Sequence, residues 1–155
     1  MTVTREPEPI PLTGIEPIRG WEEFLRDGEG FLRTATAAYT KKNRIFTSEI
    51  LYNLIAMAIE KFIMAALMRH GAMPYNHTMQ DLVAAMEDTF PGRIVDIQEG
   101  LLELDKYQDI CDLDGFTISP PKREKIPEIL KLADKLLLLV IGDLCMTEKN
   151  DRVTK

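Results

Sequence analysis

The side chains best suited to chemistry in this 155-residue sequence lie close together near its middle. The only two histidines are His70 and His77, and Arg69 and Asp81 lie nearby. An arginine can stabilise the charge of a phosphate, and a histidine can transfer a proton near neutral pH. These four residues are therefore the candidates for an enzyme that acts on phosphate.

A metal site is the second chemistry that these residues suggest. His77 and Asp81 are four residues apart and would share one face of a helix. A metal needs more ligands than this pair, and Glu60 is the one further candidate. A hydrogen-bonded or capping His–Asp pair explains the same residues, so we predict no metal and no cofactor. Glu60 itself needs a partner in its apolar segment, and Lys61, Arg69 or a neighbouring helix cap are the alternatives.

Two short basic clusters are candidates for contacting a phosphate, and Lys122 and Arg123 are the ligand-binding candidates among them. The net charge of −6 argues against nucleic-acid binding by the overall field, but it allows a local basic site. The first cluster also suits the negative end of a helix dipole, which is the structural alternative. The two clusters are Lys41, Lys42 and Arg44, and Lys122, Arg123 and Lys125.

The element that must position these residues is an apolar helix from about Ser48 to Arg69. Apolar residues recur in it every three or four positions, which predicts a wide apolar face. Thr47 or Ser48 can cap its start, and Gly71 can end it. Charged residues interrupt it before about 18 apolar residues accumulate, so we predict a buried bundle helix and no membrane span. A dimer seam along one side is a further alternative.

The same periodicity predicts helices over residues 21–42, 79–90 and 93–110 and a last one from about Ile126 to Leu144. No segment alternates as a strand. The predicted fold is all-α: an antiparallel bundle of four long helices plus a short helix. Its domain covers residues 21–147, after an extended N-terminal arm at 1–20 and before a polar tail at 148–155.

The N-terminal arm is rich in proline, which disfavours a helix and favours an extended chain. Its apolar residues, among them Ile10 and Leu12, could pack on a surface, so a docked arm and a free tail both stay open. The arm does not resemble a signal peptide, and Cys111 and Cys145 have no metal or disulfide spacing. We therefore expect a cytoplasmic protein with two reduced thiols.

The segment Ala58-Ile59-Glu60-Lys61-Phe62-Ile63-Met64-Ala65-Ala66-Leu67, followed by Gly71 and Asn76-His77-Thr78-Met79-Gln80-Asp81-Leu82, resembles the HEPN family of helical domains. That family often shows an A-x-E-K-x-x-K-A-x-L helix and a T-H-D-L-like start to the next helix. Met64 replaces the family's second lysine, and His77 and Asp81 are separated by three residues. The resemblance extends in helix order over residues 21–144, with its motifs in the central segment.

The resemblance implies a function as well as a fold. Many HEPN ribonucleases use an arginine and a histidine separated by four to six residues on a later helix, whereas no histidine follows His77 here. We therefore expect a non-catalytic HEPN-like binding module, homodimeric, which acts through a nucleotidyltransferase-type protein partner or through a nucleotide or RNA ligand. The alternative is a divergent HEPN-type ribonuclease or a nucleotide-binding toxin–antitoxin component.

Overall fold

The structure, a computed structural model, describes residues 16–107 and 120–145. All regular structure in these ranges is helical, which confirms the all-α prediction. The five α-helices are α1 (Trp21–Thr40), α2 (Ser48–Arg69), α3 (Met79–Thr89), α4 (Gln98–Glu103) and α5 (Ile126–Leu139). Three shorter helical segments complete the fold: η1 (Leu104–Tyr107) continues α4, η2 (Arg123–Lys125) precedes α5, and the wider π-helical turn η3 (Val140–Leu144) continues α5.

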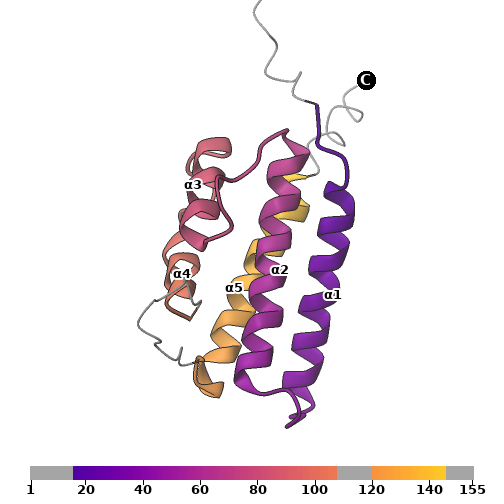
Figure 1. The fold of residues 1–155 in the computed structure, drawn as a ribbon, viewed down its shortest axis with the longest axis vertical. Helices are drawn as coiled ribbons and strands as arrows, with labels where there is room; N and C mark the ends of the chain where they lie inside the picture. Colours follow the sequence, from indigo (N-terminus) through magenta and orange to yellow (C-terminus); the bar gives the residue numbers. More distant parts are fainter. Residues whose placement is uncertain (1–15, 108–119, 146–155) are drawn as a thin grey trace, which may run out of the picture.

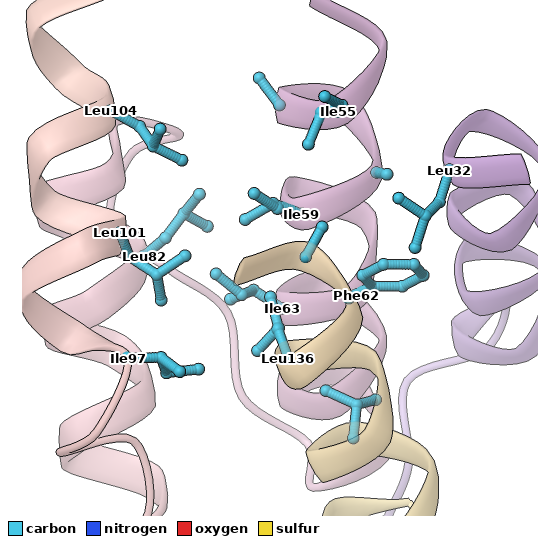
Figure 2. Packing of buried hydrophobic residues seen from close by; sticks show 14 of the residues in the cluster. Leu32, Ile55, Ile59, Phe62, Ile63, Leu82, Ile97, Leu101, Leu104 and Leu136 are labelled. Atoms are coloured by element: carbon cyan, nitrogen blue, oxygen red, sulfur yellow. The ribbon is translucent and has the colours of Figure 1, made fainter. Parts of the chain in front are cut away.

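Helix α2 lies between α1 and the pair α3 and α4, with α5 also packed against it (Figure 1). Arg123 before α5 contacts Phe46, two residues before α2, and His70 after α2 contacts Leu144 in η3. These contacts at both ends show that α5 runs parallel to α2. Tyr52, near the start of α2, donates its hydroxyl to the Leu104 carbonyl just after α4, at 2.9 Å. Leu104 lies level with Ile55 and Ile97 lies level with Ile63, so α4 runs in the opposite direction to α2 (Figure 2).

The local signals at both ends of α2 are those expected from the sequence. The Thr47 hydroxyl caps the helix by accepting from the Ile50 N–H at 3.2 Å, and Gly71 takes the left-handed conformation with φ 72°. Within the described ranges, α2 alone is long and apolar enough to cross a membrane, but 67% of that apolar stretch is buried inside the bundle. This burial is the property expected of a central bundle helix.

The core is a single apolar cluster that surrounds α2. Ile59, Phe62 and Ile63 of α2 are fully buried. Figure 2 shows them facing side chains from every neighbouring helix, since α1, α3, α4 and α5 each contribute to the cluster. The labelled partners are Leu32, Leu82, Ile97, Leu101, Leu104 and Leu136. Burial of this kind stabilises the fold by roughly 25 cal/mol per Å² of apolar surface.

The segment predicted as a long helix over residues 93–110 is the main difference from the sequence analysis. Residues 93–97 form consecutive turns, α4 begins only at Gln98, and the chain tightens into η1 after Glu103. Ile94 and Ile97 are nevertheless buried. Their three-residue spacing places both side chains on one side of a tight turn as well as of a helix, so the spacing alone does not distinguish the two. Residues 108–110 and the tail at 148–155 lie outside the described residues.

A glycine allows α1 and α2 to pack closely. A Cβ atom on Gly28 would lie 2.7 Å from Cε1 of Phe62, so no larger residue fits without movement of the Phe62 ring. Gly30, two residues further along the same helix, has no atom within 4 Å of the corresponding position. Of these two glycines, only Gly28 therefore permits a close helix contact.

Substituting these two glycines should have opposite effects on stability. We expect Gly28→Ala to lower the free energy of unfolding by about 1–3 kcal/mol, because it overpacks the core against Phe62. Gly30→Ala should raise it by up to about 1 kcal/mol, because alanine is the better helix former and the site is open. Urea denaturation of both variants measures the difference. Equal stabilisation by the two substitutions would contradict the close packing at Gly28.

Candidate functional site

A cleft at the start of α2 brings together residues from both basic clusters. It has a volume of about 900 Å³ and is lined by the end of α1, the α1–α2 loop and η2. Its lining residues, which we call the basic cleft, are Tyr39, Thr40, Lys42, Arg44, Thr47, Arg123 and Glu124. The two clusters are far apart in the sequence, and only the folded chain joins them.

Arg123 holds the two sides of the basic cleft together. Its Nη1 donates to the Phe46 carbonyl at 3.0 Å, a contact between residues 77 positions apart. The guanidinium also lies over the Tyr39 ring, 5.8 Å from the ring centroid. The opposite wall begins at Lys42, which takes a left-handed backbone conformation with φ 53° and so turns the chain away from α1. The cleft is therefore built by defined contacts around Arg123.

The charge of the basic cleft is positive in a protein that is acidic overall. Lys42, Arg44 and Arg123 face one carboxylate among the lining residues, that of Glu124. Lys42 and Arg44 are exposed, so their charged ends are accessible to a ligand. Thr47 is the N-cap of α2, whose positive dipole end therefore lies at the same cleft. This arrangement can bind an anion such as a phosphate group.

The remaining members of the two clusters are not among the residues that line the cleft. Lys122 is exposed and immediately precedes Arg123. Lys125 lines a separate cleft of about 320 Å³ beside α4 and donates to Glu128 at 3.1 Å. The hydrogen bond to Glu128, and then its negative charge, raise the pKa of Lys125. The structure thus places Arg123 in the basic cleft and Lys125 outside it.

Glu60 is hydrogen bonded to His77, with which the sequence groups it only as a candidate metal ligand. Nδ1 of His77 donates to Oε1 of Glu60 at 2.5 Å, which joins the middle of α2 to the loop before α3. Lys61, one of the expected partners, instead lies over the Phe24 ring at 4.3 Å. The His77 and Glu60 side chains are 60% and 37% exposed, so Glu60 is less buried than its apolar segment suggested.

Asp81 acts locally at the start of α3. It accepts a hydrogen bond from the Thr78 hydroxyl at 2.8 Å, and the same hydroxyl accepts from the Asp81 N–H at 3.1 Å. Thr78 is thus the N-cap of α3. Within residues 16–107 and 120–145, no group of three His, Cys, Asp or Glu side chains is placed to hold a metal ion.

A second residue, Asp105, also binds the start of α3, and the sequence did not indicate it. The Asp105 carboxylate in η1 accepts from the Met79 N–H at 2.9 Å and from the Gln80 N–H at 3.1 Å. It therefore satisfies two of the backbone donors that a helix start leaves unpaired. No local signal indicates this cap, because the donors and the carboxylate are about 25 residues apart in the chain.

Arg69 and His70 hold the other end of α2. The Arg69 guanidinium lies over the Trp21 ring, 5.6 Å from its centroid. Nε2 of His70 donates to the Leu144 carbonyl at 2.7 Å, and its ring packs edge-on against Phe90 at 4.8 Å. Both contacts join α2 to distant segments, so the structure gives each residue a structural role.

Cys145, at the end of η3, carries a free and buried thiol. Burial raises the pKa of this thiol from 9.0 to about 11, although the positive charge of Arg69 opposes the shift. This placement agrees with the expectation of a reduced, buried thiol. Cys111 lies outside the described residues.

The raised pKa of Cys145 predicts slow alkylation. In a Cys111→Ser variant, iodoacetamide at pH 8 should modify Cys145 at least about 100-fold more slowly than in the unfolded chain, because two pKa units lower the thiolate fraction about 100-fold. The folded protein holds this proton more tightly, so the thiol's contribution to stability is full below about pH 9 and declines toward pH 11. Mass spectrometry follows the reaction. Equal rates in the folded and unfolded chains would contradict the burial.

Comparisons with known proteins place the chain in no family. No family model, curated protein or solved structure matches it.

Proposed function

We propose that the chain is a non-catalytic helical binding module that holds a nucleotide by its phosphates in the basic cleft. The observation that carries this proposal is the convergence of Lys42, Arg44 and Arg123 on one cleft at the start of α2. These cations come from two distant segments, and the contact of Arg123 with the Phe46 carbonyl fixes the segments relative to each other.

The chemistry of the cleft suits a phosphate. A guanidinium presents several donors in one plane and binds phosphate oxygens in pairs, while a lysine adds a compact positive charge. Arg123 uses Nη1 for the Phe46 carbonyl, and its other N–H groups are additional donors. The volume of about 900 Å³ lies within the range of small-molecule pockets, so the cleft is large enough to admit a nucleotide.

The fold that we propose in finer detail is a HEPN-like bundle. Its four members are α1, α2, α4 with η1, and α5 with η3, and α3 is the short additional helix. The opposite directions of α2 and α4 and the central position of α2 support this proposal. A nucleotidyltransferase-type protein partner is a further proposal that rests on the HEPN resemblance alone, and a cytoplasmic location is a further proposal that rests on the sequence pattern alone.

The surroundings of the two histidines favour binding over ribonuclease chemistry. His70 is hydrogen bonded to a backbone carbonyl, and Arg69 lies over Trp21. The Asp81 carboxylate accepts from the hydroxyl of the N-cap Thr78, whereas His77 is hydrogen bonded to Glu60. The His77–Glu60 pair is the one remaining acid–base candidate, and no histidine lines the basic cleft.

Thermal unfolding with added ligands tests the nucleotide proposal. ATP or GTP at about 100 times its Kd should stabilise the protein by about 2.7 kcal/mol. The double variant Lys42→Asn/Arg44→Ser should weaken binding at least about tenfold, because it removes two cations from the cleft. Asparagine tolerates the left-handed backbone at position 42, so this variant should fold.

The control variant is Arg19→Ser/Arg26→Ser, which loses the same charge at the opposite end of α1, and it should bind like the unchanged protein. If nucleotides do not raise the unfolding temperature, the proposal is wrong. If both variants lose the same affinity, the nucleotide is attracted only by overall charge and not by the basic cleft. A short RNA is tested in parallel. RNA cleavage that disappears in His77→Ala would favour the ribonuclease alternative.

We also propose that the module is a homodimer through α2. Ile50 and Met57 are each 42% exposed and lie seven residues apart, so they share one side of the helix. The partly buried Leu54 lies between them. A second copy that covers this side would remove an exposed apolar strip from water.

Analytical ultracentrifugation should find a dimer of the unchanged protein and a monomer of Ile50→Glu/Met57→Glu, because charges at both positions would be buried in the interface. Leu138→Glu is the control, since Leu138 is 74% exposed on α5, and this variant should stay dimeric. A monomeric unchanged protein at micromolar concentration would contradict the dimer.

A further inference from the structure

A pocket between α3 and the loop that leads into it takes no part in the nucleotide proposal or the dimer proposal. Helix α3 lies on the side of α2 away from α1 (Figure 1). The pocket has a volume of about 510 Å³. We call it the α3 pocket, and it is lined by residues 72–75 of the loop and by Asp81, Ala84, Ala85, Asp88 and Thr89 of α3.

Small side chains on α3 leave the space for this pocket. Asp81, Ala85 and Asp88 share one side of the helix, because they are spaced by four and then three residues. The larger apolar side chains of α3, such as Leu82 and Met86, are buried in the bundle instead. The pocket side of α3 is therefore an alanine surface with a carboxylate at each end, about 10.5 Å apart along the helix axis.

The loop that forms the other wall is fixed at both ends. After α2, the N–H groups of Gly71 and Ala72 donate to carbonyls in the last turn of the helix, at 3.0 Å and 2.8 Å. This pair of bonds is the Schellman motif, which sets the direction in which the chain leaves a helix. Before α3, the hydrogen bond between His77 and Glu60 holds the loop to the middle of α2. A wall that is already fixed loses little conformational entropy when a ligand binds.

Two large apolar side chains of this loop extend into water. Met73 is 56% exposed, and Tyr75 is 92% exposed. Pro74 lies between them, restricts the backbone and has no N–H group that needs a partner. Methionine and tyrosine are enriched in protein interfaces, and tyrosine often contributes a large share of the binding energy. The loop therefore presents the side chains that a protein partner typically covers.

The charge around the α3 pocket is negative. Residues 72–92 contain Asp81, Glu87 and Asp88 but no lysine or arginine. Glu87 accepts from the Gly92 N–H at 3.0 Å, and one oxygen of Asp81 accepts from the Thr78 hydroxyl. Asp88 is exposed and makes no hydrogen bond or ion pair with another described residue. A cationic group of a partner would therefore find a carboxylate in the pocket that the fold does not use.

We propose that the α3 pocket binds an arginine side chain of a protein partner, in a segment that also carries an apolar residue. The aliphatic stem of this arginine packs on Ala84 and Ala85, and its guanidinium pairs with Asp88. The neighbouring apolar residue covers Met73 and Tyr75. A guanidinium suits this place because it forms paired hydrogen bonds with a carboxylate and stacks on aromatic rings.

The proposal is independent of the nucleotide proposal, because the basic cleft is lined by different residues. Selection of random peptides displayed on phage tests it. The full chain should enrich peptides that carry an arginine beside an apolar residue. The variant Met73→Ser/Tyr75→Ser should bind a labelled synthetic peptide from this selection at least about tenfold more weakly, measured by fluorescence anisotropy. Both side chains are exposed, so this variant should fold. Ile45→Ser/Val95→Ser removes two exposed apolar side chains elsewhere and should bind like the unchanged protein.

A cycle of charge substitutions tests the arginine itself. Asp88→Asn should weaken binding of the peptide at least about tenfold, whereas Asp27→Asn, the same change at an exposed position on α1, should not. Citrulline in place of the peptide arginine keeps its shape and removes its charge. The effect of Asp88→Asn on the citrulline peptide should therefore be close to zero.

Three results would overturn the proposal. The first is a selection that enriches no peptides, or peptides without arginine. The second is equal binding of the selected peptide to the unchanged protein and to Met73→Ser/Tyr75→Ser, because the peptide would then occupy another surface. The third is an equal effect of Asp88→Asn on the arginine and citrulline peptides, because the carboxylate would then not contact the guanidinium.

Discussion

The burial of α2 on almost every side is the constraint on which the rest of the structure depends. A helix whose apolar residues cover most of its circumference is stable in water only when other helices surround it. Helices α1, α3, α4 and α5 all contribute to this cover. Among the described residues, no polar or charged residue is buried. The described charged side chains accordingly lie at the ends and edges of the bundle.

Polar contacts tie both ends of α2 to segments that are distant in the sequence. At its start, Arg123 reaches the Phe46 carbonyl, and at its end His70 reaches the Leu144 carbonyl. A hydrogen bond from a charged donor contributes about 1.5–3 kcal/mol, so Arg123 stabilises the loop as well as giving the cleft its charge. Arg123 thus serves both the fold and the proposed ligand site, so its substitution would affect stability as well as binding.

The periodicity of apolar residues was sufficient to predict most of the helices. It predicted α1, α2, α3 and α5 close to their described bounds, and Thr47, which caps α2, was one of the two cap candidates. It failed over residues 93–97, because the apolar spacing of Ile94 and Ile97 fits turns as well as a helix. The helical class was therefore predictable, but the length of the third bundle member was not.

The candidate site was less predictable, because its residues are joined by contacts over long sequence separations. The two basic clusters were visible in the sequence, but nothing local indicated that Arg123 would join Lys42 and Arg44. The sequence likewise left several alternative partners for Glu60, and in the structure the partner is His77. Sequence spacing identifies candidate groups, whereas their pairing depends on how the loops return to α2.

The Asp105 cap has a consequence for the order in which the chain folds. The first turn of α3 obtains two of its backbone partners from a carboxylate that follows about 25 residues later in the chain. An isolated 11-residue helix is marginal in water, because its first turn is costly to nucleate. Helix α3 therefore gains its full stability only after η1 has formed and returned to it. We therefore expect the segment from Thr78 to Tyr107 to open as one cooperative unit.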